Sequence, residues 1–145
     1  MRQLKSCGVI CFRRQPDLEF LLMEHPHRFD WPKGHILPDE TEKECALREF
    51  EEETCIPRVC IQIDPHFRHE ATYHPHYRHF GGEVIEKTLV LFLGCLLKDV
   101  AVSSTEHRSH RWVKWSPPHR VQKKAIDPAL EAVALYWKDI GPQQA

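Results

Sequence analysis

Three glutamates, Glu49, Glu52 and Glu53, are the side chains whose type and spacing most clearly suggest chemistry. They lie in a stretch, residues 41–54, that contains no glycine or proline. On a helix, where successive residues turn by about 100°, the three carboxylates share an arc of about 100°. Oxygen ligands grouped in this way suit hard divalent cations such as Mg²⁺ or Mn²⁺.

The alternative interpretation is a solvated acidic helix face, which is what most runs of charge form. Three carboxylates on one face repel one another, however, and they lie past the middle of the helix, where the helix dipole favours cations. Because a bound divalent cation removes both penalties, the spacing favours a metal site.

The sequence around these glutamates resembles the Nudix box, a motif of glycine, glutamate and an Arg-Glu…Glu-Glu group at fixed spacing. The matching residues are Gly34, Glu40, Arg48, Glu49, Phe50, Glu52, Glu53 and Ile56. Cys55 departs from the motif, which has glycine there in a left-handed helix end. We therefore expect either about 1 kcal/mol of strain at Cys55 or a differently ended helix, with the carboxylate face intact.

Nudix proteins hydrolyse a nucleoside diphosphate linked to another moiety, using Mg²⁺ or Mn²⁺. The resemblance implies that the Gly34 carbonyl, Glu49, Glu52 and Glu53 hold the metal. It makes Glu52 the first candidate, and Glu49 the second, for the base that activates water for attack on phosphorus. Arg48 would orient the carboxylates through ion pairs, a role compatible with an ordinary ion pair within the helix.

Most of the chain also resembles one Nudix subfamily, the asymmetric diadenosine tetraphosphate hydrolases. The similar segments are 7–14, 19–22, 31–35, 67–73, 87–88, 106–107 and 111–112. The Pro-Lys-Gly-His element at 32–35 occurs in diphosphoinositol polyphosphate hydrolases too, so only the whole set of segments favours the dinucleotide enzymes. The resemblance implies release of a nucleoside triphosphate and a monophosphate from the tetraphosphate.

Five further residues receive candidate roles from this resemblance. Lys33 and Lys87 are candidate phosphate contacts, with solvated lysines as the alternative. Tyr73 either stacks on a base or packs at a strand end. Glu106 is a further metal ligand or base, or else a surface acid. His35 either contacts phosphate or is structural.

A histidine-rich segment spans residues 66–79. Its histidines are His66, His69, His74, His76 and His79, with Arg68 and Arg78 between them. Neither a thiolate nor a carboxylate accompanies them at a recurrent zinc-site spacing, which argues against zinc. We expect this basic segment to receive a polyphosphate, and the alternative is an exposed polar loop. An unchanged Michaelis constant after alanine replacement of His74, His76 and Arg78 would contradict the first interpretation.

The elements that position these residues are predicted from periodicity and turn signals. Thr41 and Glu44 form a capping box that starts a helix over 41–54, and Pro57 follows its end. Asp127 and Pro128 match the N-cap and first position of a second helix that runs to residue 140. Strands are expected at 4–14, 18–24, 58–63, 67–73, 87–97 and 111–115, with an irregular segment at 25–34 and an exposed loop at 74–82.

These elements predict one α/β (α+β) domain over residues 1–145 with a mixed sheet. The resemblance adds that this sheet is sandwiched between helices, as an α/β/α Nudix fold. The 145-residue length is enough for a single sizeable core.

Charge and composition limit the partners. The 20 basic and 21 acidic residues leave a net charge of −1, which argues against a nonspecific nucleic-acid binder. No apolar run is long enough to span a membrane, and the N-terminus lacks the features of a signal peptide. The six cysteines form no Cys-x-x-Cys pair, so we expect reduced thiols and a cytoplasmic location. We also expect the protein to be a monomer or weak dimer.

The charge is unevenly distributed along the chain. Residues 39–53 carry a net −6, whereas the remainder carries +5 and all eleven histidines. An acidic metal-binding region within a basic surface suits a small nucleotide polyphosphate better than a long nucleic acid.

Two other functions stay open at the level of the sequence. One is a pyrophosphohydrolase for diphosphoinositol polyphosphates or for the 5′ end of RNA. The other is a non-catalytic Nudix module that senses a nucleotide, which the intact set of Glu49, Glu52 and Glu53 argues against, because pure binding does not require all three.

Overall fold

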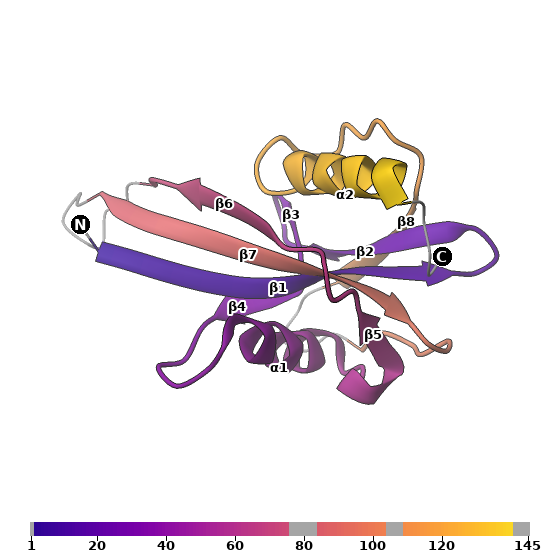
Figure 1. Ribbon diagram of the computed structural model, residues 1–145, viewed down its shortest axis with the longest axis horizontal. Coiled ribbons are helices and arrows are strands. Elements are labelled where there is room, and N and C mark those ends of the chain that lie inside the picture. Colours follow the sequence, from indigo (N-terminus) through magenta and orange to yellow (C-terminus); the bar gives the residue numbers. More distant parts are fainter. Residues whose placement is uncertain (1, 76–83, 104–108, 141–145) are drawn as a thin grey trace.

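The fold of the chain was analysed in a computed structural model that describes residues 2–75, 84–103 and 109–140. Within these residues, eight strands form one mixed sheet with α1 and α2 on opposite faces (Figure 1). The strands are β1 (Arg2–Arg14), β2 (Leu18–Glu24), β3 (Phe29–Asp30), β4 (Lys33–His35), β5 (Ile61–Ile63), β6 (His69–Tyr73), β7 (Ile85–Leu96) and β8 (Ser109–Lys114). The helices are α1 (Glu42–Thr54) and α2 (Asp127–Ile140).

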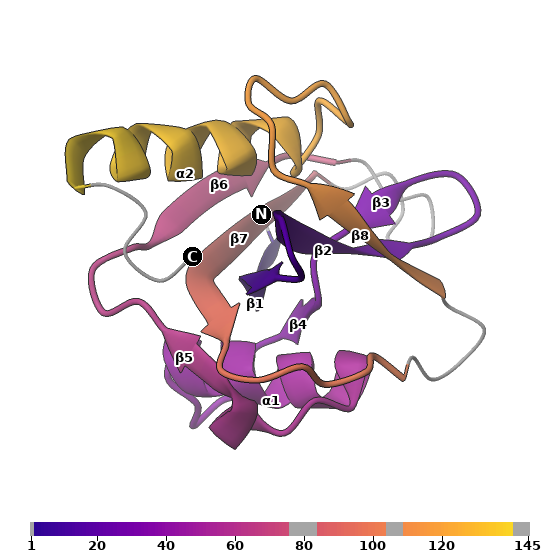
Figure 2. The ribbon, with the colours of Figure 1, turned by 90° about the vertical axis from the view of Figure 1, so that its right-hand side faces the viewer.

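Strands β1 and β7 form the centre of the sheet. They pair in parallel from Arg2 opposite Ile85 to Phe12 opposite Cys95. The main strand order is β3-β2-β1-β7-β5, with β4 paired to β1, β6 to β7 and β8 to β2. Figure 2 shows the same three layers from the side, so the predicted α/β/α arrangement is confirmed.

Alternation along the central strands divides the core between the two helices. Cys7, Val9 and Cys11 of β1 pack with the residues of α1, whereas Ile10 and Phe12 pack with those of α2. Successive strand residues point to opposite faces, and here both faces are covered. This is why residues 7–12, the part of β1 between the two helices, contain no polar side chain apart from the cysteine thiols.

Most of the predicted elements are confirmed, including the β1–β2 hairpin and both helices. Residues 25–34 were expected to be irregular but contain β3 and β4. These strands are too short for a periodic signal, and pairing such as Met23 with Asp30 defines them. Residues 58–60 were expected to be extended but form a 3₁₀ turn, in which the Cys60 amide donates to the Pro57 carbonyl.

The end of α1 at Thr54 is as predicted, whereas the role of Asp127 at the start of α2 differs from the prediction. Helix α1 ends before Pro57, because Cys55 already has left-handed backbone angles (φ 60°, ψ 18°). Of the two alternatives expected at Cys55, the structure shows the left-handed helix end. Asp127 is at the start of α2, but its carboxylate accepts hydrogen bonds from the amides of Val121 and Gln122, so it stabilises the preceding turn.

The six cysteines are thiols without disulfide bonds, and Cys7, Cys11, Cys45 and Cys60 are buried, as expected. In the part of the chain that the structure describes, no helix has the length and apolar character needed to cross a membrane.

Candidate active site

Helix α1 is fixed at its start and along one face. The Thr41 hydroxyl accepts a hydrogen bond from the Glu44 amide (3.1 Å), and the Thr41 amide donates to the Glu44 carboxylate (2.8 Å). The buried face of the helix consists of Cys45, Ala46, Phe50 and Thr54. The carboxylate face is therefore directed away from the core, with Glu49 and Glu53 half-buried and Glu52 57% exposed.

Gly34 on β4 lies directly against the carboxylate of Glu49. A Cβ atom at position 34 would lie 2.0 Å from both Cδ and Oε1 of Glu49, which is far inside van der Waals contact. β4 is held at this position by pairing with β1, where Gly34 is opposite Cys7. The missing side chain at position 34 thus provides the space that the Glu49 carboxylate occupies.

Arg48 connects Glu40, which precedes α1, to two glutamates of the carboxylate face, Glu49 and Glu52. Its guanidinium binds both oxygens of Glu40 and donates to Glu49 at 2.7 Å and to Glu52 at 3.3 Å. A further bond, of 3.1 Å, reaches the His35 carbonyl. The hydrogen bonds from Arg48 lower the pKa of Glu40 to about 2, so Glu40 stays ionised and holds the guanidinium in place.

Lys33 connects the carboxylate face to a buried acid. Its amide donates to the Glu53 carboxylate at 3.3 Å, and its ammonium lies 3.3 Å from Oδ2 of Asp30. Asp30 is only 8% exposed, and its other oxygen accepts the Trp31 amide at 2.9 Å. Asp30 therefore holds Lys33 at the junction of β3 and β4.

The residues of the carboxylate face were tested for their fit to a divalent cation. Among the described residues, no three histidine, cysteine, aspartate or glutamate side chains are gathered closely enough to form a metal site. Glu49 and Glu52 instead share Arg48, and the Gly34 carbonyl accepts a weak bond from the Cys45 thiol (3.4 Å).

These ligands nevertheless match the chemistry of a hard cation. All of them are oxygens, and the space at Gly34 admits a carboxylate beside a backbone carbonyl. The residues therefore fit a hard divalent cation, provided that Glu49 and Glu52 give up their bonds to Arg48 when the cation binds.

Two of the predicted substrate contacts, Tyr73 and Lys87, lie on neighbouring strands. Tyr73 on β6 is directly opposite Lys87 on β7, and Lys87 is opposite Leu4 on β1. Burial, followed by the charge of Lys33, lowers the pKa of Lys87. Burial raises the pKa of Tyr73, and the Lys124 ammonium lies 5.6 Å from the centre of its ring.

His35 is exposed at the end of β4, where its Nδ1 is 3.4 Å from the Ser6 hydroxyl. Partial burial of the ring, followed by the charges of Lys87 and Lys33, lowers its pKa. The basic groups are thus close enough to influence one another electrostatically.

A pocket of about 420 Å³ brings many of these groups together. It is lined by Ser6, His25, Arg28, Asp30, Lys33, Gly34, His35, Leu37, Arg48, Glu49 and Glu53. Six of these residues were predicted from the sequence, whereas Glu52, Tyr73 and Lys87 lie outside the lining. The lining carries both acidic and basic side chains, and several of them are paired, as Arg48 is with Glu49 and Lys33 with Asp30.

Sequence reasoning missed Asp30, Arg28 and Ser6. One signal for Asp30 was available in the sequence, because this aspartate directly precedes the matched segment 31–35. An aspartate buried beside such a segment needs a basic partner. Glu106 and the segment 76–79, with His76 and Arg78, lie outside the described residues. His74 is described, and its Nε2 lies 3.5 Å from the Glu86 carboxylate.

The chain was compared with known proteins. A family model described as the NUDIX domain matches residues 5–136. The asymmetrical bis(5′-nucleosyl)-tetraphosphatase of Mus musculus is 35% identical over 123 residues, which cover 76% of this chain and 78% of that protein. The mRNA-decapping protein g5R of African swine fever virus is 41% identical over 69 residues, but these cover only 48% of this chain and 25% of that protein.

Solved structures support the same fold. The crystal structure of a C. elegans Ap4A hydrolase binary complex superposes with a TM-score of 0.78, covering 94% of this chain and 98% of that one. At 24% identity, this similarity concerns the arrangement of the elements alone.

Proposed function

Because the chain belongs to the Nudix family, we propose that it hydrolyses dinucleoside polyphosphates, such as diadenosine tetraphosphate, to a nucleoside triphosphate and a monophosphate. The observation that carries this proposal is the contact of Gly34 with the Glu49 carboxylate, in a pocket that is also lined by Lys33, His35 and Arg48. The similarity to asymmetrical bis(5′-nucleosyl)-tetraphosphatases over three quarters of the chain supports the substrate class.

The metal in this proposal is Mg²⁺ or Mn²⁺. The Gly34 carbonyl, Glu49, Glu52 and Glu53 would hold it, with Glu106 as a further ligand. When bound, such an ion neutralises phosphate oxygens and lowers the pKa of a coordinated water.

The chain's own groups have separate roles. Glu52, the most exposed of the three carboxylates, accepts the proton of the attacking water, with Glu49 as the alternative base. Arg48 orients both carboxylates through its bonds of 2.7 and 3.3 Å. Lys33, His35 and Lys87 bind phosphate oxygens, and Tyr73 stacks on a base.

We also propose one Nudix hydrolase domain over residues 1–145, acting in the cytoplasm as a monomer or weak dimer. The family match to residues 5–136 and the six unbridged thiols support this description.

A product assay distinguishes the substrate classes. The full chain is incubated with Mg²⁺ and, separately, with diadenosine tetraphosphate, a diphosphoinositol polyphosphate, a nucleotide sugar and 5′-triphosphorylated RNA. We expect ATP and AMP from the first, at a kcat/KM well above those of the others. A preference for RNA would instead favour an RNA 5′-end pyrophosphohydrolase. If none of the four substrates is hydrolysed, a nucleotide-sensing module is favoured.

A pair of helix variants tests the catalytic assignment. Glu52→Gln keeps the size of the side chain but cannot accept a proton, so we expect kcat to fall by about 10²–10⁴-fold. Glu51→Gln is the matched control, because Glu51 belongs to another face of α1 and binds Arg58 at 2.7 Å. Near-normal turnover by Glu52→Gln would remove Glu52 from this role and direct attention to Glu49.

A further inference from the structure

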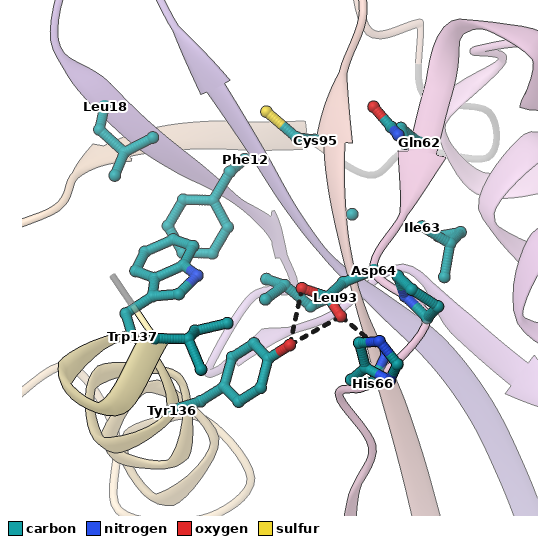
Figure 3. Close-up of a pocket in the computed structure, with 13 residues that line it drawn as sticks. Phe12, Leu18, Gln62, Ile63, Asp64, His66, Leu93, Cys95, Tyr136 and Trp137 are labelled. Carbon is teal, nitrogen blue, oxygen red and sulfur yellow. Dashed lines mark hydrogen bonds between the residues drawn. The ribbon is translucent and has the colours of Figure 1, made fainter. Parts of the chain in front are cut away.

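A second pocket, of about 410 Å³, lies on the α2 side of the sheet (Figure 3). It is lined by Phe12, Leu18, Gln62, Ile63, Asp64, Pro65, His66, Leu93, Gly94, Cys95, Tyr136, Trp137 and Ile140. None of these residues lines the candidate active site. Along β1, Phe12 is six residues from Ser6, which corresponds to about 20 Å, so the two pockets are well separated along the strand.

The walls of the second pocket are mainly aromatic and aliphatic. The rings of Phe12 and Trp137 lie side by side, with centroids 4.8 Å apart, and Tyr136 projects from the same helix as Trp137 (Figure 3). Ile63 and Leu93 add aliphatic surface. A space of this volume, lined in this way, is of the size and character that small organic molecules occupy.

One ionisable cluster faces this apolar space. The Tyr136 hydroxyl donates to both oxygens of Asp64, at 2.9 and 3.0 Å, and the His66 amide donates to Oδ1 at 2.7 Å. Burial and then the bond to Asp64 raise the pKa of Tyr136, so the phenol keeps its proton and remains the hydrogen-bond donor to the Asp64 carboxylate.

Among the described residues that line the pocket, the acidic side chain is that of Asp64 and the one basic side chain is the imidazole of His66. Neither lysine nor arginine is among these described residues. A carboxylate beside apolar walls favours a cationic guest, and the faces of tryptophan and tyrosine rings attract the same charge. An anionic polyphosphate, by contrast, is repelled by Asp64.

A purely structural role explains only part of this arrangement. The Tyr136–Asp64 bond links α2 to the segment that follows β5, and a simple link of this kind is useful in any fold. It does not require the cavity beside it, because side chains normally fill protein interiors at close to crystal density.

We propose that this second pocket binds a small organic cation, a protonated amine with an aromatic body. The ammonium group lies against Asp64 and Tyr136, and the ring enters the space beside Trp137 and Phe12. This ligand is not the substrate of the proposed hydrolysis, so the inference goes beyond the proposed function and does not depend on it.

The test compares three probes that share an indole ring and differ in charge. Tryptamine is the cation, 3-(indol-3-yl)propanol the neutral probe and indole-3-propionate the anion, each titrated calorimetrically into the full chain. We expect tryptamine to bind at least about tenfold more tightly than the neutral probe, and the anion not to bind. Equal affinities for the three probes, or binding of none at millimolar concentration, would overturn the proposal.

Variants locate the binding site. Asp64→Asn should reduce the preference for tryptamine over the neutral probe to less than about threefold, and Trp137→Leu should weaken both probes. Glu131→Gln, at an exposed position of the same helix, is the matched control and should bind like the parent. Thermal unfolding of each variant shows whether it is folded.

One variant tests whether tryptamine binds instead to the other acidic region of the molecule, the carboxylate face of α1. Glu52→Gln alters the carboxylate face of α1, where a cation also has electrostatic reason to bind. Tryptamine affinity that is unchanged in Glu52→Gln and reduced in Asp64→Asn supports the second pocket. The reverse pattern overturns the proposal without bearing on the hydrolase activity.

Discussion

At the scale of single residues, the site depends on an absent side chain as much as on those present. Gly34 is required because the Glu49 carboxylate occupies the volume where a Cβ would lie. We predict that Gly34→Ala displaces Glu49 and lowers hydrolase activity by about 10- to 100-fold, with a higher Mg²⁺ concentration needed for half-maximal activity. A Mg²⁺ titration of the hydrolysis rate measures both effects.

Gly94→Ala provides the matched control for this substitution. A Cβ at position 94 would lie 2.6 Å from Cδ1 of Ile61, the end of a flexible side chain far from the carboxylate face. We expect some loss of stability there but the parental Mg²⁺ dependence. An identical Mg²⁺ dependence for Gly34→Ala and the parent would show that Gly34 does not position Glu49.

At the scale of elements, the end of α1 is the place where this chain departs from its family's pattern. Cys55 has a φ of 60°, a left-handed conformation that glycine adopts without steric cost. Cys55→Gly should therefore raise the free energy of unfolding by about 1 kcal/mol, measured by urea denaturation. The upstream carboxylates are unchanged, so activity should stay near the parental level.

The control for Cys55→Gly is a glycine substitution nearby without the left-handed backbone. Val59 is 79% exposed, and it is not among the described residues with positive φ. Val59→Gly should lower stability by about 0.5–1 kcal/mol, because glycine gains more freedom in the unfolded chain. If Cys55→Gly destabilises the protein to the same extent, the left-handed conformation carries no strain.

Helix α1 also shows what a sequence reveals about this site and what it conceals. The capping box and the 3.6-residue period predict where the helix lies and that Glu49, Glu52 and Glu53 share a face, because both signals are local. The contact of Gly34 with Glu49 and the burial of Asp30 depend on β4 and β3, which are too short for a periodic signal, and β4 also pairs with the distant strand β1. The charge pattern likewise could not show that Arg48 forms ion pairs with Glu40, Glu49 and Glu52 at the same time.

At the scale of the whole molecule, Glu42 at the start of α1 forms ion pairs with two parts of the chain that are distant in sequence, β1 and the segment before β6. Its carboxylate accepts hydrogen bonds from Lys5 of β1 at 2.8 Å and from Arg68, which precedes β6, at 2.9 and 3.0 Å. Arg68 continues the network to Glu70 at 2.8 Å. This network holds the first turn of α1, and with it the carboxylate face, against the sheet.

The same network makes the stability of the fold depend on acidic pH. Bonds from Arg68, followed by those from Lys5, lower the pKa of Glu42 from 4.5 to about 2, so the unfolded chain takes up a proton more readily than the folded one between these values. The stabilisation is complete above about pH 4.5 and is lost as the pH falls towards about 2. Since the groups are partly exposed and screened by solvent, we expect Glu42→Gln to cost about 1 kcal/mol at pH 7 and almost nothing at pH 2. Urea denaturation across this range, with Glu131→Gln as the exposed control, measures the difference, and a Glu42→Gln curve parallel to that of the parent would refute it.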